Sequence, residues 1–198
     1  MPGNDIYYSA DPKTVDGSVR FKFKKNYESK MILYIAVSTK GVSEPYFKTS
    51  SLTTNQKIYQ EECLSRILIS FIQKHHNNDD YVFWPNKASA HYAKKTIRFL
   101  QNKNITFVPK EHNPKNRPQC CPVEGFFGEL SSLVYKKGWK AKSIKHLKGR
   151  IKKFLKTMDT TVSNKLVQGS TQNYGLLLTM GLTVKTTKIF GIVKSYVV

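Results

Sequence analysis

The sequence contains few cysteines, and their positions favour neither a disulfide nor a zinc site. Its three cysteines are Cys63, Cys120 and Cys121, an odd number, and two sequence neighbours cannot easily form a disulfide with each other. The sequence has no C-x-x-C motif, so a structural zinc site is not expected. We therefore expect three ordinary thiol side chains in a reducing compartment.

Long apolar runs are also absent. No stretch approaches the roughly 18 apolar residues that a membrane-spanning helix needs. The opening Met-Pro-Gly-Asn-Asp lacks the charged-then-apolar pattern of a secretion signal. We expect neither membrane insertion nor secretion.

Acidic residues are scarce. The 198 residues include 13 Asp+Glu against 33 Lys+Arg, which gives a formal net charge of +20. Such an excess of one sign disfavours a compact monomer unless a polyanion neutralises it. A nucleic acid is the first candidate for that polyanion, and an anionic membrane surface is the second.

The residues that are plentiful predict a folded α/β domain. Hydrophobic residues make up 39% of the chain and aromatic residues 12%, which excludes a disordered basic tail. Alternating or continuous apolar patterns predict strands at 20–24, 31–37, 45–47, 81–84 and 105–108. Apolar residues three and four positions apart predict helices at 55–73, 88–101, 122–134 and 143–156. This alternation is typical of a mixed sheet flanked by helices. Residues 158–198 contain β-prone segments, but the pattern does not show where they lie in the fold.

One segment concentrates the positive charge. It carries ten cations between positions 136 and 156 and no acidic residue. These residues are Lys136, Lys137, Lys140, Lys142, Lys145, Lys148, Arg150, Lys152, Lys153 and Lys156. Such a stripe suits phosphate contacts, which make affinity fall steeply with salt. A solvated helix face or a nuclear import signal is the alternative. Lysine does not read bases, so no sequence preference is expected.

Two further segments carry a specific pattern. Residues 81–95 read YVFWPNKASAHYAKK, and residues 113–130 read NPKNRPQCCPVEGFFGEL. The first resembles the second catalytic block of mariner-like transposases, where a strand ends in an aspartate and a His follows. The second resembles the third block, where an Asn-Pro loop precedes a helix that bears a glutamate. Residues 34–47 also fit the hairpin of that catalytic domain, so the resemblance covers roughly residues 3–156.

The resemblance implies a ribonuclease H-like fold of the DDE superfamily, in which three carboxylates hold two Mg²⁺ ions for DNA strand cleavage and transfer. Glu124 matches the third carboxylate, which could ligate a metal. Asn86 stands at the position of the second, with 37 residues between them, and an amide brings no charge to the metals. His91 matches the family's His, and we expect it to serve helix packing or a loop hydrogen bond. We expect His75 and His76 to end a helix.

In the family, the first aspartate lies on a central strand, and the resemblance implies that this strand would come before the region that starts near Pro2. Without that strand, 31–37 and 81–84 lack their shared hydrogen-bond partner, and each unpaired buried group costs about 1–3 kcal/mol. The two strands could close up, residues 20–24 or the tail could replace the strand, or the chain could fail to fold alone. The family's DNA-recognising helix-turn-helix region has no counterpart either. We therefore divide the chain into a truncated catalytic domain, 1–157, and a C-terminal tail, 158–198.

These observations lead to one hypothesis and two alternatives. The hypothesis is a degenerate transposase-derived protein of the nucleus that binds DNA without sequence preference and does not cleave or transfer strands. The first alternative is an active metal-dependent transposase or nuclease that uses Asn86 as a neutral ligand. The second is an interaction module that forms a homodimer or binds a full-length transposase.

Overall fold

A computed structural model describes residues 11, 13–15, 30–49, 55–113, 122–158 and 187–197, without the side chains of 122–124, 192, 193 and 197. Its strands are β1 (Lys30–Ser38), β2 (Gly41–Val42), β3 (Tyr46–Lys48), β4 (Tyr81–Pro85) and β5 (Thr187–Val197). Its helices are α2 (Gln56–Ile58), the π-helix η1 (Tyr59–Ile69), α3 (Ser70–His75), the 3₁₀ turn η2 (Ser89–Tyr92), α4 (Lys94–Asn102), α5 (Pro122–Val134), the 3₁₀ turn η4 (Lys136–Gly138) and α6 (Ile144–Thr157).

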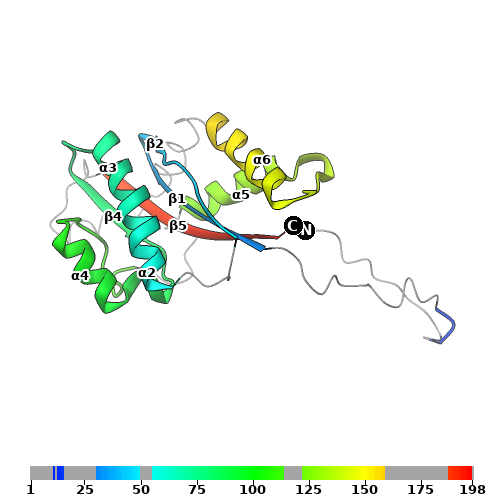
Figure 1. Cartoon of the computed structure of the whole chain (residues 1–198), viewed down its shortest axis with the longest axis horizontal. Coiled ribbons are helices and arrows are strands. Elements are labelled where there is room, and N and C mark those ends of the chain that lie inside the picture. The colour runs from blue at the N-terminus through cyan, green and yellow to red at the C-terminus, as the bar shows by residue number, and fades with distance from the viewer. Residues whose placement is uncertain are drawn as a thin grey trace.

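The five strands form one mixed sheet in the order β2-β1-β5-β4, with β3 also paired to β1. Strand β1 is antiparallel to β2, β3 and β5, and β5 is parallel to β4. Figure 1 shows β5, drawn in red, running through the middle of the sheet between β1 and β4. The sequence therefore folds as the mixed α/β domain that its pattern predicts.

The central place in the sheet is occupied by the C-terminal strand. The pairing of β5 with β1 extends from Lys30 opposite Val197 to Val37 opposite Phe190. On its other side, β5 pairs with β4 from Tyr81 opposite Thr187 to Pro85 opposite Gly191. Of the segments expected to pair with both β1 and β4, the tail is thus the one that does so in the structure. The predicted strand 20–24 lies outside the described residues.

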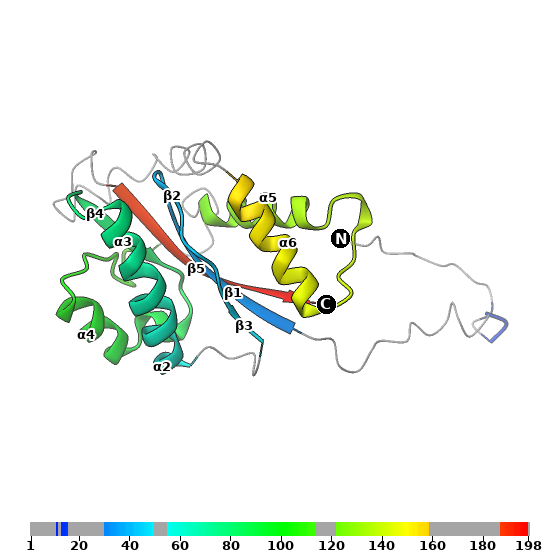
Figure 2. The same ribbon diagram turned by 45° about the horizontal axis from the view of Figure 1, so that its top comes forward.

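Each face of the sheet is covered by its own helices and has its own core (Figure 2). Alternate residues of β1 point to opposite faces, as a strand requires. Leu33 and Ile35 pack with α5 and α6, whereas Tyr34 and Ala36 pack with η1 and α3. This double burial explains why β1 reads as a continuous apolar run rather than an alternating one.

The helices follow the predicted ranges with local differences. The helix predicted at 55–73 extends from α2 to α3, and 11 residues within it are a π-helix. The helix predicted at 88–101 is broken at Ala93, whose extended backbone (ψ 143°) separates η2 from α4. Helix α6 begins where expected, because the Ser143 side chain accepts a hydrogen bond from the amide of His146 at 3.1 Å.

The strand predicted at 105–108 is shortened to a single bridge residue, Phe107, beside β4. Phe107 forms an isolated parallel bridge with Phe83. The amide of Phe83 donates to the carbonyl oxygen of Thr106 at 2.8 Å, and its carbonyl oxygen accepts from the amide of Val108 at 3.0 Å. Two neighbours shorten this extended segment: Asn104 adopts a left-handed backbone (φ 53°) before it, and Pro109 has no amide hydrogen to donate after it.

None of the helices in the described ranges has the length and apolar character that a membrane-spanning helix needs.

Candidate functional site

The candidate site lies where β4 ends. Asn86 directly follows Pro85, and its side chain is exposed. Its backbone amide donates to the carbonyl oxygen of Gly191 on β5 at 3.3 Å. The position that resembles the second catalytic carboxylate is therefore held against the central strand.

His91 supports the backbone of Asn86 rather than pointing into the site. Its Nδ1 lies 2.8 Å from the carbonyl oxygen of Asn86, to which it donates, and its ring stacks on Tyr59 with centroids 4.0 Å apart. The ring is only 2% exposed, and this burial lowers the pKa of His91 from 6.5 to about 4. We expected His91 to serve helix packing or a loop hydrogen bond, and the structure shows both, a ring contact with Tyr59 of η1 and a hydrogen bond to Asn86.

Asn113 joins the two motif segments, a role that the sequence did not reveal. Its amide nitrogen donates to the carbonyl oxygen of Pro85 at 2.9 Å and to the hydroxyl of Tyr92 at 2.8 Å. Its side-chain oxygen accepts from the indole nitrogen of Trp84 at 3.1 Å. The buried amide thereby fixes the start of the 113–130 segment to the end of β4. The sequence shows the Asn-Pro pair as part of a motif, but the hydrogen-bond partners of Asn113 become known only from the fold.

Among the described residues, those near Asn86 do not supply the ligands of a pair of divalent metals. Such a site needs carboxylates from neighbouring elements. Asn86 supplies a neutral amide, and β5, directly beside it, contains no acidic residue. Glu124 lies in the first turn of α5, but its side chain is outside the described part of the structure. Among the described residues, no three His, Cys, Asp or Glu side chains could hold a metal together.

His75 and His76 end a helix, as predicted. His75 is the last residue of α3, and His76 follows as its buried cap. The two ring nitrogens of His76 have partners, Ser38 Oγ at 2.8 Å and Asp79 Oδ2 at 2.9 Å. Burial lowers the pKa of His76, against the opposing effect of Asp79.

Cys63 is a buried free thiol, and its burial raises the pKa of the thiol to about 12.

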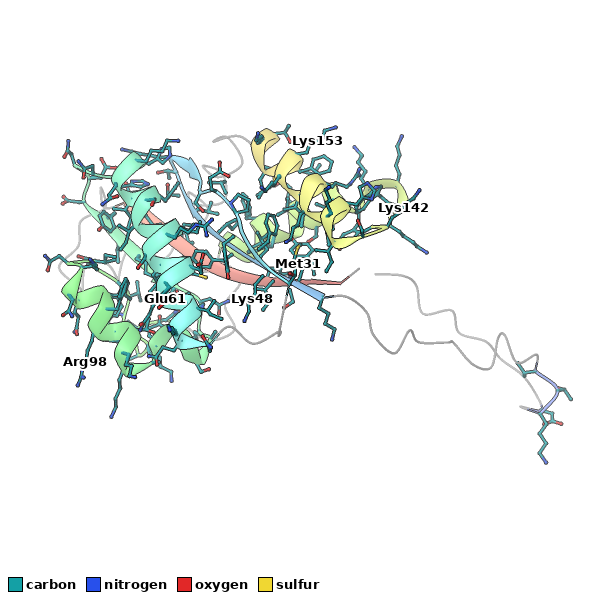
Figure 3. The ribbon with its side chains drawn as sticks, viewed as in Figure 1. Met31, Lys48, Glu61, Arg98, Lys142 and Lys153 are labelled. Carbon is teal, nitrogen blue, oxygen red and sulfur yellow. The ribbon has the colours of Figure 1, made fainter. Side chains whose placement is uncertain are left out.

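The basic segment forms a solvent-facing surface along and before α6. Eight of its lysines are exposed, and Lys148 is partly exposed. Lys142 and Lys153 point outward near opposite ends of this surface (Figure 3). No salt bridge between described residues involves any of the ten cations. The apolar side of α6, including Leu147 and Ile151, packs into the core and leaves the charge outside.

Arg150 differs from the lysines around it. Its Nε donates to the carbonyl oxygen of Val134 at 2.6 Å, at the carboxyl end of α5. Its guanidinium also lies 4.5 Å from the ring centroid of Trp139 and 5.1 Å from that of Phe154. This arginine links α5 to α6, in addition to the phosphate contact that the sequence predicts for it.

Comparison with known proteins tests this arrangement. No protein-family model matches the chain, and no curated protein sequence matches it. Solved structures do match. The crystal structure of the catalytic domain of Mos1 mariner transposase is similar with a TM-score of 0.59 and 14% identity, over 75% of this chain and 74% of that chain. The chain has the fold of the mariner transposase catalytic domain.

Two further structures support the same fold. The Mos1 transposase catalytic domain with raltegravir and manganese matches with a TM-score of 0.62 and 14% identity, over 79% of this chain and 82% of that one. The Mos1 transposase paired-end complex with the left transposon end matches with a TM-score of 0.64 and 16% identity, over 89% of this chain and 50% of that one. The chain thus spans half the length of the transposase in the latter complex. The ribonuclease H-like fold implied by the motif segments is confirmed.

Proposed function

We propose that this protein is a transposase-derived domain that binds nucleic acid without sequence preference and does not cleave or transfer DNA strands. The observation that carries the binding proposal is the surface of α6, where exposed lysines face solvent and no described carboxylate pairs with them. Lysine contacts to phosphate position a protein on nucleic acid but specify no base. The nucleus is the compartment that we propose for this activity.

The Mos1 complex supports DNA as the ligand, because that transposase was captured with its left transposon end. The proposed absence of cleavage is supported by the end of β4. There, Asn86 replaces a carboxylate, and the adjoining Gly191 and its strand bring none. A neutral Asn86 beside Glu124 would bring less negative charge than the two carboxylates that such a pair of metals needs there.

Binding to two unrelated duplexes, followed by fluorescence anisotropy at several salt concentrations, tests the binding proposal. We expect equal affinities for both sequences and a steep loss of affinity with salt. Changing Lys145, Lys152 and Lys153 to Gln should reduce the slope of log K against log [salt] by about 3, since each lost phosphate contact removes about 0.9.

A matched control is available on the opposite face of the sheet. Lys94, Lys95 and Lys103 are exposed on and directly after α4, so changing them to Gln removes the same charge. This control should leave the slope nearly unchanged. Equal effects of the two triple variants would show that net charge alone attracts DNA and would overturn the assignment to α6. Strong discrimination between the two duplexes would overturn the absence of sequence preference.

A further inference from the structure

A groove of about 510 Å³ runs between the edge strand β3 and helix α6. Tyr46 and Phe47 of β3 line one side, and Lys145, Lys148 and Lys152 of α6 line the other. The two aromatic side chains are partly exposed. The groove therefore combines flat apolar surface with a row of cations, and it lies beside the sheet edge rather than at the end of β4.

Two cations of the groove lie over one aromatic ring. The Nζ atoms of Lys148 and Lys152 lie 5.7 Å and 6.0 Å from the ring centroid of Phe47. Arg66 reaches the same groove from η1, on the other face of the sheet, where Glu62 pairs with it at 2.8 Å. None of the described residues that line the groove is acidic. The uncompensated charge therefore comes from the three lysines.

This combination selects a polyanion that also presents a flat apolar face. The geometry points to single-stranded nucleic acid, with its phosphates at the lysines and one unpaired base on the ring of Phe47. Stacking of bases on aromatic side chains inside a positively charged groove is how single strands are bound without sequence readout. A duplex keeps its bases paired and stacked, so it can use the lysines of α6 but not the ring.

Gly149 provides room for this ligand between the lysines. It lies exposed on α6 and lines the groove, and a Cβ added there would meet no described atom within 4 Å beyond the neighbouring residues and backbone of its own helix. A larger side chain at this position would fill the groove without disturbing the core. Glutamate is also a better helix former than glycine, so such a change does not weaken α6.

The inference deepens the proposed nucleic-acid binding and rests on it. Its test compares a labelled oligothymidine with a duplex of equal length by anisotropy at low salt. Phe47→Leu keeps an apolar side chain but removes the ring, and we expect about tenfold weaker binding of the single strand with duplex affinity unchanged. Gly149→Glu should also weaken single-strand binding.

Gly128→Glu is the matched control for charge. Gly128 is exposed within α5, has equal free space around it and lies outside the groove lining. Single-strand affinity that is insensitive to Phe47→Leu, or equally sensitive to both glycine variants, would overturn the inference while duplex binding by the wild type still supports the proposed function. Failure of the wild type to bind either oligonucleotide would overturn both.

Discussion

Gly191 lies so close to Phe83 that a Cβ added to the glycine would come within 2.5 Å of Cε2 of the ring. The hydroxyl of Tyr34 would lie 2.8 Å from the same added atom. Side chains from both neighbouring strands thus close over the backbone of β5 at this point. Glycine, which has no Cβ, therefore occupies the position of β5 where a Cβ would not fit.

Replacing Gly191 with Val should therefore destabilise the protein, although valine favours strands more than glycine does. Overpacking of this kind costs about 1–3 kcal/mol. Ser195→Val is the matched control, because Ser195 is exposed on the same strand. Urea unfolding monitored by near-UV circular dichroism gives both free energies. A Gly191→Val protein as stable as the control would mean that β5 does not occupy the centre of the sheet.

The position of β5 could not be predicted from the sequence. The pattern of residues 189–198 is β-prone, but a strand's neighbours depend on contacts between distant parts of the chain, such as Lys30 with Val197. By contrast, β1 and α6 could be predicted, because a buried strand and an amphipathic helix leave their periodicity in the local sequence. The motif segments identified the fold, since their order matched a known catalytic domain.

The candidate site was predicted in part. The sequence located Asn86 next to a strand end, and the structure places it there. The hydrogen bonds of the Asn113 side chain, which clamp the start of the 113–130 segment to the end of β4, were not predicted. They join Asn113 to Trp84 and Tyr92, 29 and 21 positions away, and a local sequence pattern does not show contacts at that separation. The groove at Phe47 was missed for the same reason: no local pattern shows which helix covers an edge strand.

Asn113→Ala should lower the free energy of unfolding by several kcal/mol. The change leaves the Trp84 indole nitrogen and the Pro85 carbonyl oxygen without the partners that they have now, at about 1–3 kcal/mol for each buried group. The exposed neighbour His112 offers the control His112→Ala, which should cost little. Urea titrations followed by tryptophan fluorescence compare the two. Equal stability of both variants would contradict the role of Asn113 as a clamp.

The stability of the protein should fall between neutral and mildly acidic pH because of His91. Its pKa is about 4 in the folded protein against 6.5 for the free side chain, so the unfolded chain binds more protons in this window. The stabilisation is complete above pH 6.5 and is lost as the pH falls toward 4. We expect a loss of about 2–3 kcal/mol between pH 7.5 and 4.5 from this residue.

His91→Gln isolates that contribution from the carboxylates that titrate in the same range. The variant should be less stable than the wild type at pH 7.5, and the difference should shrink at pH 4.5. Unfolding free energies of both proteins at the two pH values give the result. A difference that stays constant with pH would mean that His91 is not buried in its neutral form.

Asn86→Asp should not create a metal-dependent enzyme. The new carboxylate would still face a central strand without an acidic residue, so two dications would remain poorly neutralised. We expect no Mn²⁺-dependent rise in melting temperature beyond that of the wild type. A clear rise that disappears when Glu124 is also changed to Gln would contradict this account, because it would show a site needing only one restored ligand.

The most direct test of binding without cleavage uses supercoiled plasmid DNA, incubated with the pure protein and Mg²⁺ or Mn²⁺ and run on a gel before and after protease digestion. The account requires a retarded band before digestion and intact supercoiled plasmid after it. Nicked or linear DNA formed by the wild type but not by Glu124→Gln would contradict the account. So would a plasmid that is not retarded at low salt.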